Sequence, residues 1–477
     1  MKTNLFLILF VALSTLSLRA QDFVDINAPL PDLLFSSVAF GDADNDGDLD
    51  LYLSGVDMDF NHKGGLYLYE NGNYMFSPES NLPLTYLGAA EWGDVNGDNL
   101  LDIIIMGTND EFEDFTEIYM NNGDGTFTSM NAGIVPIVQG DVHLVDIDGD
   151  GDLDVAITGI GLEDRITKLY ENDGNGNFTE MTDVVLPGMN LGRIKWADYN
   201  NDGHLDFVLA GFNDSDGGTQ DFYTKIHTNN GDGTFSAAVI PLTQCWLGDM
   251  EWGDYNNDGN PDLVISGAGG DGVERFTLVY RNNGDGTFTE LGLGLPGVSH
   301  SSIEWADFNG DGRLDLFVVG ETDTPGEGSS ISKIYFNMGD DTFVDSEIDV
   351  FNISYYGDAD VGDFDNDGKI DLVITGYSEP YYSAASSVVY KNEIIISTRE
   401  LKKDFTISPV PAKDFLTIKS STTINRLTMH NMSGQLILSQ ELNDLSQTIN
   451  TEKLPAGLYL ITIYTPTEVI TKKVIIE

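Results

Sequence analysis

Asp42-Ala-Asp-Asn-Asp-Gly-Asp-Leu-Asp50 is an acidic nonapeptide that the 477-residue chain repeats, with variation, seven times. The copies begin at Asp42, Asp94, Asp146, Asp198, Asp254, Asp307 and Asp363, at intervals of 52, 52, 52, 56, 53 and 56 residues. Each copy has Asp at positions one, five and nine, Asp or Asn at position three, and Gly at position six, except for Asn99 in the second copy. A regular period of this length predicts one supersecondary unit repeated seven times.

Each repeat is predicted to form four strands. An apolar residue or Trp two places before the first Asp, as at Trp92, suits an inner strand that runs into the acidic loop, and residues 103–105 are typical of a buried second strand. A third strand ends at a turn such as Asn121-Asn-Gly-Asp-Gly-Thr-Phe127, which is a hairpin signal before a fourth strand. Four strands in about 50 residues predict an all-β fold, a seven-bladed β-propeller, rather than a solenoid.

The two ends of the repeat region predict how the ring closes. The seventh repeat stops after its third strand, at residues 390–393, and residues 22–26 resemble the fourth strand of other repeats, such as residues 343–347. We therefore expect the N-terminal strand to complete the last blade, which would remove an open sheet edge.

The acidic loops predict cation sites. Alternating carboxylates around a tight turn surround one hard cation with oxygen ligands, which is the chemistry of Ca²⁺. Position one is Asp42, Asp94, Asp146, Asp198, Asp254, Asp307 and Asp363; position three is Asp44, Asn96, Asp148, Asn200, Asn256, Asn309 and Asp365; position five is Asp46, Asp98, Asp150, Asp202, Asp258, Asp311 and Asp367. Position nine is Asp50, Asp102, Asp154, Asp206, Asp262, Asp315 and Asp371. Position seven is Asp48, Leu100, Asp152, His204, Asn260, Arg313 and Lys369, so we expect this position to bind through its backbone carbonyl.

Two other interpretations of the loops were weighed. An EF-hand needs Glu at position twelve, where this chain has Leu, Ile or Val, so the loop should open into a strand. Plain turns also favour Asp, Asn and Gly, but a turn does not require four acidic or amide side chains at fixed offsets. We therefore expect up to seven structural Ca²⁺ ions, because so dense a cluster of like charges should destabilise the empty fold.

These loops and their flanking strands resemble the FG-GAP and VCBS repeats of integrin α-chain propellers and many bacterial surface proteins. The resemblance covers about residues 22–396 and implies a calcium-binding propeller. It says less about function, because such repeats serve adhesion, carbohydrate binding and sometimes enzymes. Asn99 departs from the pattern, although Asn tolerates left-handed geometry.

The remaining segments indicate export. Residues 1–20 read as a signal peptide, and Cys245 is the only cysteine. After a linker at residues 397–404, residues 405–477 alternate apolar and polar residues and predict a small Ig-like β-sandwich. Ser408-Pro-Val-Pro411, Met432-Ser-Gly-Gln435, Leu454-Pro-Ala-Gly-Leu-Tyr-Leu460 and Lys472-Lys-Val-Ile475 closely resemble the type A sorting domain of the Bacteroidota type IX secretion system. The resemblance implies that the type IX machinery is a partner and that the protein is secreted or placed on the outer cell surface; an ordinary accessory sandwich is the alternative.

Charge and loop placement limit the partners. The formal charge is −55, which would repel a nucleic-acid backbone, so we predict no nucleic-acid partner; we also expect a monomer. In a four-stranded meander the acidic loops lie on one face and the variable connections on the other. The predicted function is therefore binding or adhesion, with a glycan or surface protein held on the face opposite the acidic loops. The candidate ligand residues are Trp246, Tyr355, Tyr356, Tyr377, Tyr381 and Tyr382.

A catalytic interpretation stays open as the alternative. The chain shows no nucleophile elbow, zinc-type His motif or phosphate loop, so we predict no catalytic residues. Some calcium-rich propellers that resemble this one are polysaccharide lyases, which would need a basic residue over the central face. Arg193 and Lys195 are the candidates, and we expect both to be solvated strand positions.

Overall fold

The computed structural model describes residues 23–213, 221–269, 274–322, 330–348, 350, 353–354, 357–378 and 384–394 of a first unit. In a second unit it describes residues 405–408, 412–413, 415–431, 436–451, 453–455, 457–464 and 469–476. The chain divides between the two units at Ile395 and Ile396, next to the boundary predicted between residues 396 and 397. The predicted signal peptide (1–20) and linker (397–404) lie outside the described residues.

The described residues of the first unit form seven antiparallel sheets, which we number as blades 1 to 7. Blade 1 consists of β2 (Leu34–Gly41), β3 (Asp50–Val56), β4 (His62–Glu70) and β5 (Asn73–Phe76). Blade 2 consists of β6 (Tyr86–Gly93), β7 (Asp102–Thr108), β8 (Asp114–Asn121) and β9 (Phe127–Ser129). Blade 3 consists of β10 (Val138–Val145), β11 (Asp154–Ile160), β12 (Arg165–Asn172) and β13 (Phe178–Glu180). Blade 4 consists of β14 (Asn190–Ala197), β15 (Asp206–Asn213), β16 (Asp221–Asn229) and β17 (Phe235–Ala237). Blade 5 consists of β18 (Met250–Gly253), β19 (Asp262–Ala268), β20 (Arg275–Asn282) and β21 (Phe288–Leu291). Blade 6 consists of β22 (Ser299–Ala306), β23 (Asp315–Glu321), β24 (Ser330–Asn337) and β25 (Phe343–Asp345). Blade 7 is β26 (Ile353–Ser354), β27 (Ala359–Gly362), β28 (Asp371–Ser378), β29 (Ala384–Asn392) and the N-terminal β1 (Phe23–Asp25).

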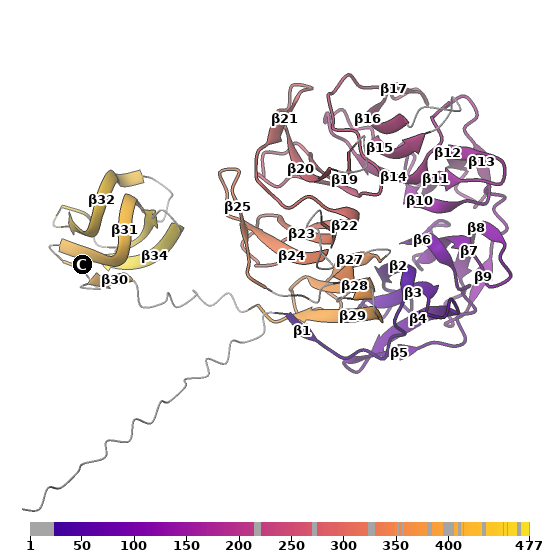
Figure 1. Ribbon diagram of the computed structural model, residues 1–477, viewed down its shortest axis with the longest axis horizontal. Helices are drawn as coiled ribbons and strands as arrows, with labels where there is room; N and C mark the ends of the chain where they lie inside the picture. The colour runs from indigo at the N-terminus through magenta and orange to yellow at the C-terminus, as the bar shows by residue number, and fades with distance from the viewer. Residues whose placement is uncertain are drawn as a thin grey trace, which may run out of the picture. The chain divides into compact units, whose positions relative to one another are not determined.

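The sheets surround a central channel, so the unit is an all-β propeller. Figure 1 shows the sheets arranged around a common centre, with strands such as β2, β6, β10 and β22 nearest to it. The channel is lined by residues from the first-strand segment of every blade, from Ser36 in blade 1 to Asp360 in blade 7. Each acidic loop joins a first strand to a second strand, as predicted.

Strand β1 closes the ring, as the sequence predicted. It pairs antiparallel with β29, with Phe23 opposite Asn392 and Asp25 opposite Tyr390. The first residues that the structure describes therefore supply the outer strand of the last blade, which leaves β29 without a free edge.

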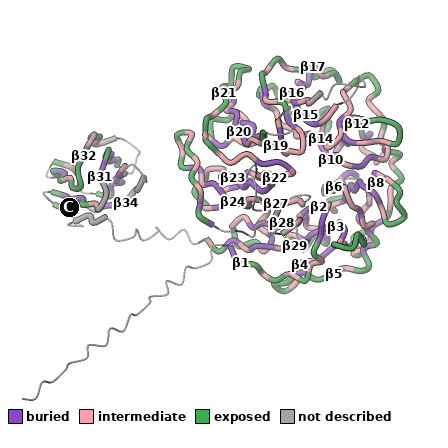
Figure 2. The backbone as a smooth tube through the Cα atoms, viewed as in Figure 1, coloured by how far each residue is buried: buried purple, intermediate pink, exposed green. Residues whose placement is uncertain are grey.

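The core lies between the blades because each second strand faces both of its neighbours. In blade 2, Ile103 and Ile105 pack against blade 1, whereas Ile104 and Met106 pack against blade 3. This alternation follows from the period-two geometry of a strand buried on both faces. The same arrangement recurs around the ring, and Val373 of blade 7 packs with Leu51 of blade 1. Figure 2 shows the second strands as buried and the loops as exposed.

The second unit is a five-stranded antiparallel sheet with its own core. Its strands are β30 (Phe405–Ser408), β31 (Phe415–Asn431), β32 (Leu436–Asn450), β33 (Gly457–Tyr464) and β34 (Val469–Ile476). Strand β31 is long enough to pair with β30, β32 and β33. Because these strands are connected as one sheet, the predicted Ig-like sandwich stays a prediction. The described residues contain no helix long and apolar enough to cross a membrane.

Candidate metal centres and the opposite face

All seven acidic loops share one backbone conformation. Position six is left-handed in every copy, with φ from 68° at Asn99 to 100° at Gly47. Asn99 adopts this geometry as the sequence analysis expected. The carboxylate at position one accepts hydrogen bonds from the turn, for example from the N–H of Asp202 and of Gly203 to the two oxygens of Asp198, at 3.0 and 2.8 Å. The loop therefore begins as a preformed acidic turn.

Position four is a second left-handed position that the sequence analysis missed. It is occupied by Asn45, Gly97, Gly149, Asn201, Asn257, Gly310 and Asn366, with φ between 56° and 80°. Only Asn and Gly occur there, and these are the residues that tolerate this geometry best. The restriction to two residue types was the signal in the sequence that could have identified it.

The carboxylate at position nine is buried and connects the loop to the third strand. In blade 5 the Oδ1 atom of Asp262 accepts the N–H of Asn282 at 2.7 Å, and all seven position-nine residues make the corresponding contact. Burial raises the pKa of Asp262 to about 7, although the hydrogen bond from Asn282 lowers it. Burial likewise raises the pKa of each of the other six to about 6 or 7.

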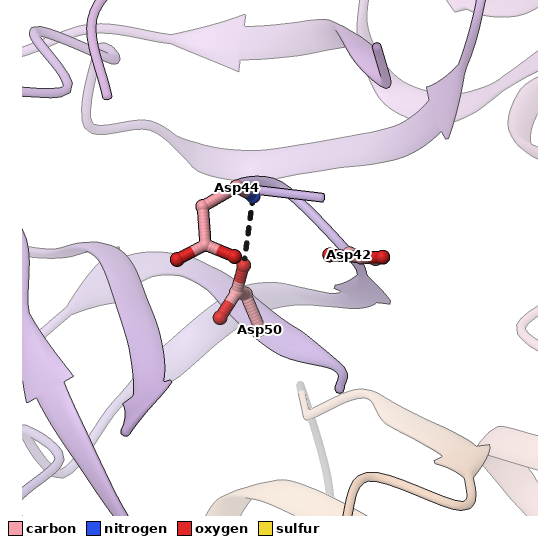
Figure 3. A group of neighbouring side chains, drawn as sticks. All are labelled: Asp42, Asp44 and Asp50. Atoms are coloured by element: carbon pink, nitrogen blue, oxygen red, sulfur yellow. Dashed lines mark hydrogen bonds between the residues drawn. The ribbon is translucent and has the colours of Figure 1, made fainter. Parts of the chain in front are cut away.

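Oxygen atoms converge at the loops as a divalent cation would require. Asp42, Asp44 and Asp50 can each bring one oxygen within 4.8 Å of the others, and Figure 3 shows the N–H of Asp44 donating to Asp50. Equivalent groups form at Asp146, Asp148 and Asp154 in blade 3 and at Asp363, Asp365 and Asp371 in blade 7.

Several ligand positions also carry buried oxygens that lack a hydrogen-bond partner among the described residues. They are Oδ1 of Asp48, Oδ2 of Asp206, Oδ1 of Asn256, Oδ2 of Asp262 and Oδ1 of Asp365. An unpartnered buried oxygen is costly unless a donor or cation reaches it. The loops therefore fit a hard, oxygen-seeking cation, which would be held by positions one, three, five and nine.

The loops are not equivalent in charge. In blade 7, the ammonium of Lys391 contacts the carboxylates of Asp365 and Asp367, which are positions three and five. In blade 6, Arg313 at position seven pairs with Asp311. In blade 1, Glu70 can instead join Asp44 and Asp46 within 4.8 Å and adds an acidic group. The sequence analysis named none of these three contacts. Lys391 and Glu70 lie on third strands, far from the loops in sequence, and position seven, where Arg313 stands, was expected to bind only through its backbone carbonyl.

An asparagine at the end of the third strand joins neighbouring loops. The Nδ2 atom of Asn282 donates to the carbonyl of Tyr199, in the loop of blade 4, at 2.7 Å and to that of Pro261 at 3.1 Å. Asn121, Asn172, Asn229, Asn337 and Asn392 make the same pair of bonds. The sequence analysis recognised these residues only as part of a hairpin turn.

The opposite face carries two aromatic groups, and each includes a predicted ligand residue. The ring of Trp246 lies 6.3 and 5.7 Å from the rings of Phe212 and Phe222, and the guanidinium of Arg165 lies over Phe212 at 4.9 Å. The indole nitrogen of Trp246 is buried without a hydrogen-bond partner among the described residues.

The second aromatic group lies at blades 7, 1 and 2. Tyr377, Phe35 and Tyr86 each pack there against a buried cluster of Leu34, Val56 and Ala385. The other candidates, Tyr355, Tyr356, Tyr381 and Tyr382, lie outside the described residues. By contrast, Trp92, Trp196, Trp252 and Trp305 pack into the cores between blades.

Arg193 and Lys195 lie on the first strand of blade 4, as expected, and they line the central channel, where their side chains are 35% and 23% exposed. The channel encloses about 320 Å³. The ammonium of Lys195 pairs with Glu251 at 2.9 Å, and Arg193 lies 3.7 Å from Asp249. Burial alone would lower the pKa of Lys195, but Glu251 and Asp249 hold it well above its usual range. A lysine held in its charged form does not serve as a general base.

Carboxylates in the channel also join the first strands of adjacent blades. The N–H of Ile303 in blade 6 donates to Asp249 at 3.0 Å, and the N–H groups of Val38 and Phe40 in blade 1 donate to Asp358 and Asp360 of blade 7 at 3.1 and 2.8 Å. The channel acids thus satisfy backbone groups of inner strands that have no partner strand. This gives them a structural role.

Two family profiles match the chain. The profile of the FG-GAP-like repeat matches residues 94–157, 146–209, 198–265 and 254–318, which lie in blades 2 to 6. The profile of the secretion system C-terminal sorting domain matches residues 406–477. The chain therefore contains FG-GAP-like repeats and a C-terminal domain that directs export by type IX secretion to the cell surface or the extracellular space.

Individual relatives are distant. The T-cell immunomodulatory protein of Rattus norvegicus is 25% identical in an alignment of 279 residues that covers 51% of this chain and 43% of that protein. The chain thus spans less than half the length of this curated relative. Among solved structures, PorZ, a surface component of the type IX secretion system of Porphyromonas gingivalis, is 10% identical with a TM-score of 0.25, covering 92% of this chain and 81% of its own. A fructofuranosidase of Schwanniomyces occidentalis is 9% identical with a TM-score of 0.29, covering 93% and 92%. TM-scores this low carry no weight for fold or function.

Proposed function

Because this chain carries FG-GAP-like repeats and a type IX sorting domain, we propose that it is a calcium-stabilised binding module outside the cell. Its ligand is a glycan or a surface protein, bound on the propeller face opposite the acidic loops. The observation that carries the proposal is the difference in backbone geometry and side chains between the two faces of the propeller. The acidic face repeats one loop backbone geometry in every blade, whereas the opposite face holds irregular connections and aromatic groups.

Calcium is proposed as a structural ion. The converging carboxylates, together with unpartnered buried oxygens such as those of Asp206 and Asp262, support an ion held at the loops of blades 1, 3, 4, 5 and 7. In this proposal each ion neutralises part of the charge of its loop and fixes the turn between the first and second strands. The ligand face is then built on a rigid scaffold, which is a common arrangement for binding proteins.

Binding on the opposite face is supported by its side chains. An aromatic ring can stack on a sugar or anchor a protein partner, and a buried indole N–H without a partner gains a hydrogen bond if a ligand acceptor reaches it. Trp246 offers both features beside Phe212 and Phe222.

The test is a binding screen with the calcium-loaded propeller, residues 22–396. A glycan array and intact cells serve as ligand sources, and the same glycans are examined for cleavage products. Retention without turnover supports a binding module. Accumulation of cleaved polysaccharide would overturn it in favour of a lyase, despite the ion pairing of Arg193 and Lys195.

A further inference from the structure

Blades 1, 2 and 3 carry short turns between their second and third strands, on the face opposite the acidic loops. We call residues 57–61, 109–113 and 161–164 the tips of these blades. In the blade-1 tip, Oδ1 of Asp57 accepts the N–H groups of Asp59 and Asn61, both at 2.9 Å. This side chain fixes the path of the turn.

The blade-2 tip is built in the same way. Oδ1 of Asn109 accepts the N–H groups of Glu111 and Glu113, both at 2.9 Å. The backbone contacts also match: the N–H of Phe60 donates to Asp57 at 2.9 Å, and that of Phe112 donates to Asn109 at 3.0 Å. The two tips are thus rigid turns of one design on adjacent blades.

Each of these tips presents a strained and exposed phenylalanine. Phe60 and Phe112 have φ of 60° and 61°, and they are 64% and 78% exposed. Left-handed geometry disfavours a residue with a bulky side chain, and an exposed ring gains little from burial. Asn or Gly would suit the turn better, and the contact of the Phe60 ring with Phe35, 6.3 Å between centroids, leaves Phe60 largely exposed, so folding alone does not explain Phe at these positions. Bulky strained residues on rigid turns indicate a binding role. The blade-3 tip adds Leu162, which is 76% exposed.

The charge of the tips narrows the partner. The three tips contain seven acidic residues and no Lys or Arg: Asp57, Asp59, Asp110, Glu111, Glu113, Glu163 and Asp164. A ring flanked by carboxylates suits a Lys or Arg side chain, which can lie over the ring while its charged group pairs with the acids. A neutral glycan could donate hydroxyl hydrogen bonds to the acids but brings no positive charge to neutralise them, and an anionic polysaccharide would be repelled.

We propose that the tips of blades 1 to 3 bind a cationic segment of a partner protein, with Phe60 and Phe112 as the anchors. The proposal deepens the function proposed above and rests on it, because it assigns the ligand to the same face. It selects a protein ligand over a glycan.

The test uses the calcium-loaded propeller and a fluorescently labelled peptide of alternating Arg and Ser. Its affinity is measured by fluorescence anisotropy at low ionic strength and compared with Gln-Ser and Glu-Ser peptides. We expect the Arg-Ser peptide to bind best, and its affinity to fall as salt is added. The double variant Phe60→Asn/Phe112→Asn should weaken binding about tenfold. Its melting temperature should be equal or higher, because Asn suits the left-handed turn.

The control is Val239→Asn, which removes an exposed apolar side chain outside the tips and should leave peptide binding unchanged. Equal binding of the three peptides, or of the double variant and the wild type, overturns the proposal. So does binding of maltoheptaose in place of the Arg-Ser peptide. If cells or glycans still bind the double variant as well as the wild type, this inference fails while the proposed function stands. If the wild type binds no glycan, cell or peptide, both fail.

Discussion

The two faces of the propeller differ in how strictly they repeat. On the acidic face, each loop has left-handed residues at positions four and six and a buried carboxylate at position nine. On the opposite face, the described connections differ in length and sequence, and they carry exposed apolar residues such as Phe60, Phe112, Leu162 and Val239. The comparison shows that the acidic face repeats the contacts that join neighbouring blades, so the connections on the opposite face can vary in length and sequence.

Chelation should produce the largest difference between the faces. In the proposed calcium-bound state, EDTA would expose the repulsion among the loop carboxylates, and each occupied site would contribute about 2.7 kcal/mol when free calcium is 100 times its Kd. We therefore expect a marked fall in the melting temperature, measured by differential scanning fluorimetry and restored by added calcium. Restoration by magnesium alone, or an unchanged melting temperature in EDTA, would contradict structural calcium.

The sequence predicted the acidic face well because its chemistry is local. Nine consecutive residues contain the turn geometry and the predicted cation ligands, and the closing strand at residues 23–25 follows from counting strands. Contacts between segments that lie apart in sequence were harder to predict, both within a blade and between blades. The carbonyl partners of Asn282 and the pairing of Lys391 with Asp365 depend on how strands far apart in sequence are placed in the ring. The channel position of Arg193 and Lys195 has the same cause.

Removing one buried carboxylate of the acidic face should lower the free energy of unfolding more than removing an exposed carboxylate of the same face. Asp262→Ala removes the acceptor for the N–H of Asn282 and a predicted calcium ligand, and we expect it to lower the free energy of unfolding by about 3 kcal/mol. The control, Asp285→Ala, lies in an exposed turn of the same blade and should cost about 1 kcal/mol or less. Chemical denaturation in calcium measures both. An equal loss of unfolding free energy in the two variants would show that burial of the position-nine carboxylate does not increase its contribution to stability.

The calcium-free protein should lose stability as the pH rises. The pKa of Asp262 is about 7 in the folded chain and that of Asp102 about 6, both above the ordinary value of an unfolded Asp. The folded state therefore keeps protons that the unfolded state has released, so stability decreases from about pH 4 to about pH 7. Melting curves in EDTA across this range should fall by several degrees. A flat profile would mean that these carboxylates stay ionised in the folded apoprotein.

Blade 7 offers a test of whether all seven acidic loops bind calcium alike. The ammonium of Lys391 pairs with Asp365 and Asp367, so it competes with a divalent ion for the same oxygens. We expect Lys391→Met to raise calcium affinity at this loop, seen as tighter binding or one more bound ion in isothermal titration calorimetry. The control is Lys225→Met on the third strand of blade 4, which lies beside Tyr223 and away from the loops. An identical isotherm for Lys391→Met and the wild type would show that the lysine moves aside at no cost.

The smallest effect on stability should come from the opposite face. Trp246→Phe keeps an aromatic ring against Phe212 and Phe222 but removes the unpartnered indole N–H, so the change in unfolding free energy should be below about 1 kcal/mol. Ligand retention by the variant, measured against whichever glycan or cell surface the wild type binds, should nevertheless decrease. Trp252→Phe is the matched control, because its indole N–H donates to the backbone carbonyl of Lys195 inside the ring at 3.1 Å. It should destabilise the propeller and leave the ligand affinity of the folded protein unchanged. If Trp246→Phe left ligand affinity unchanged and Trp252→Phe lowered it, the ligand would bind away from Trp246. A residue that contacts the ligand should change affinity with little effect on stability.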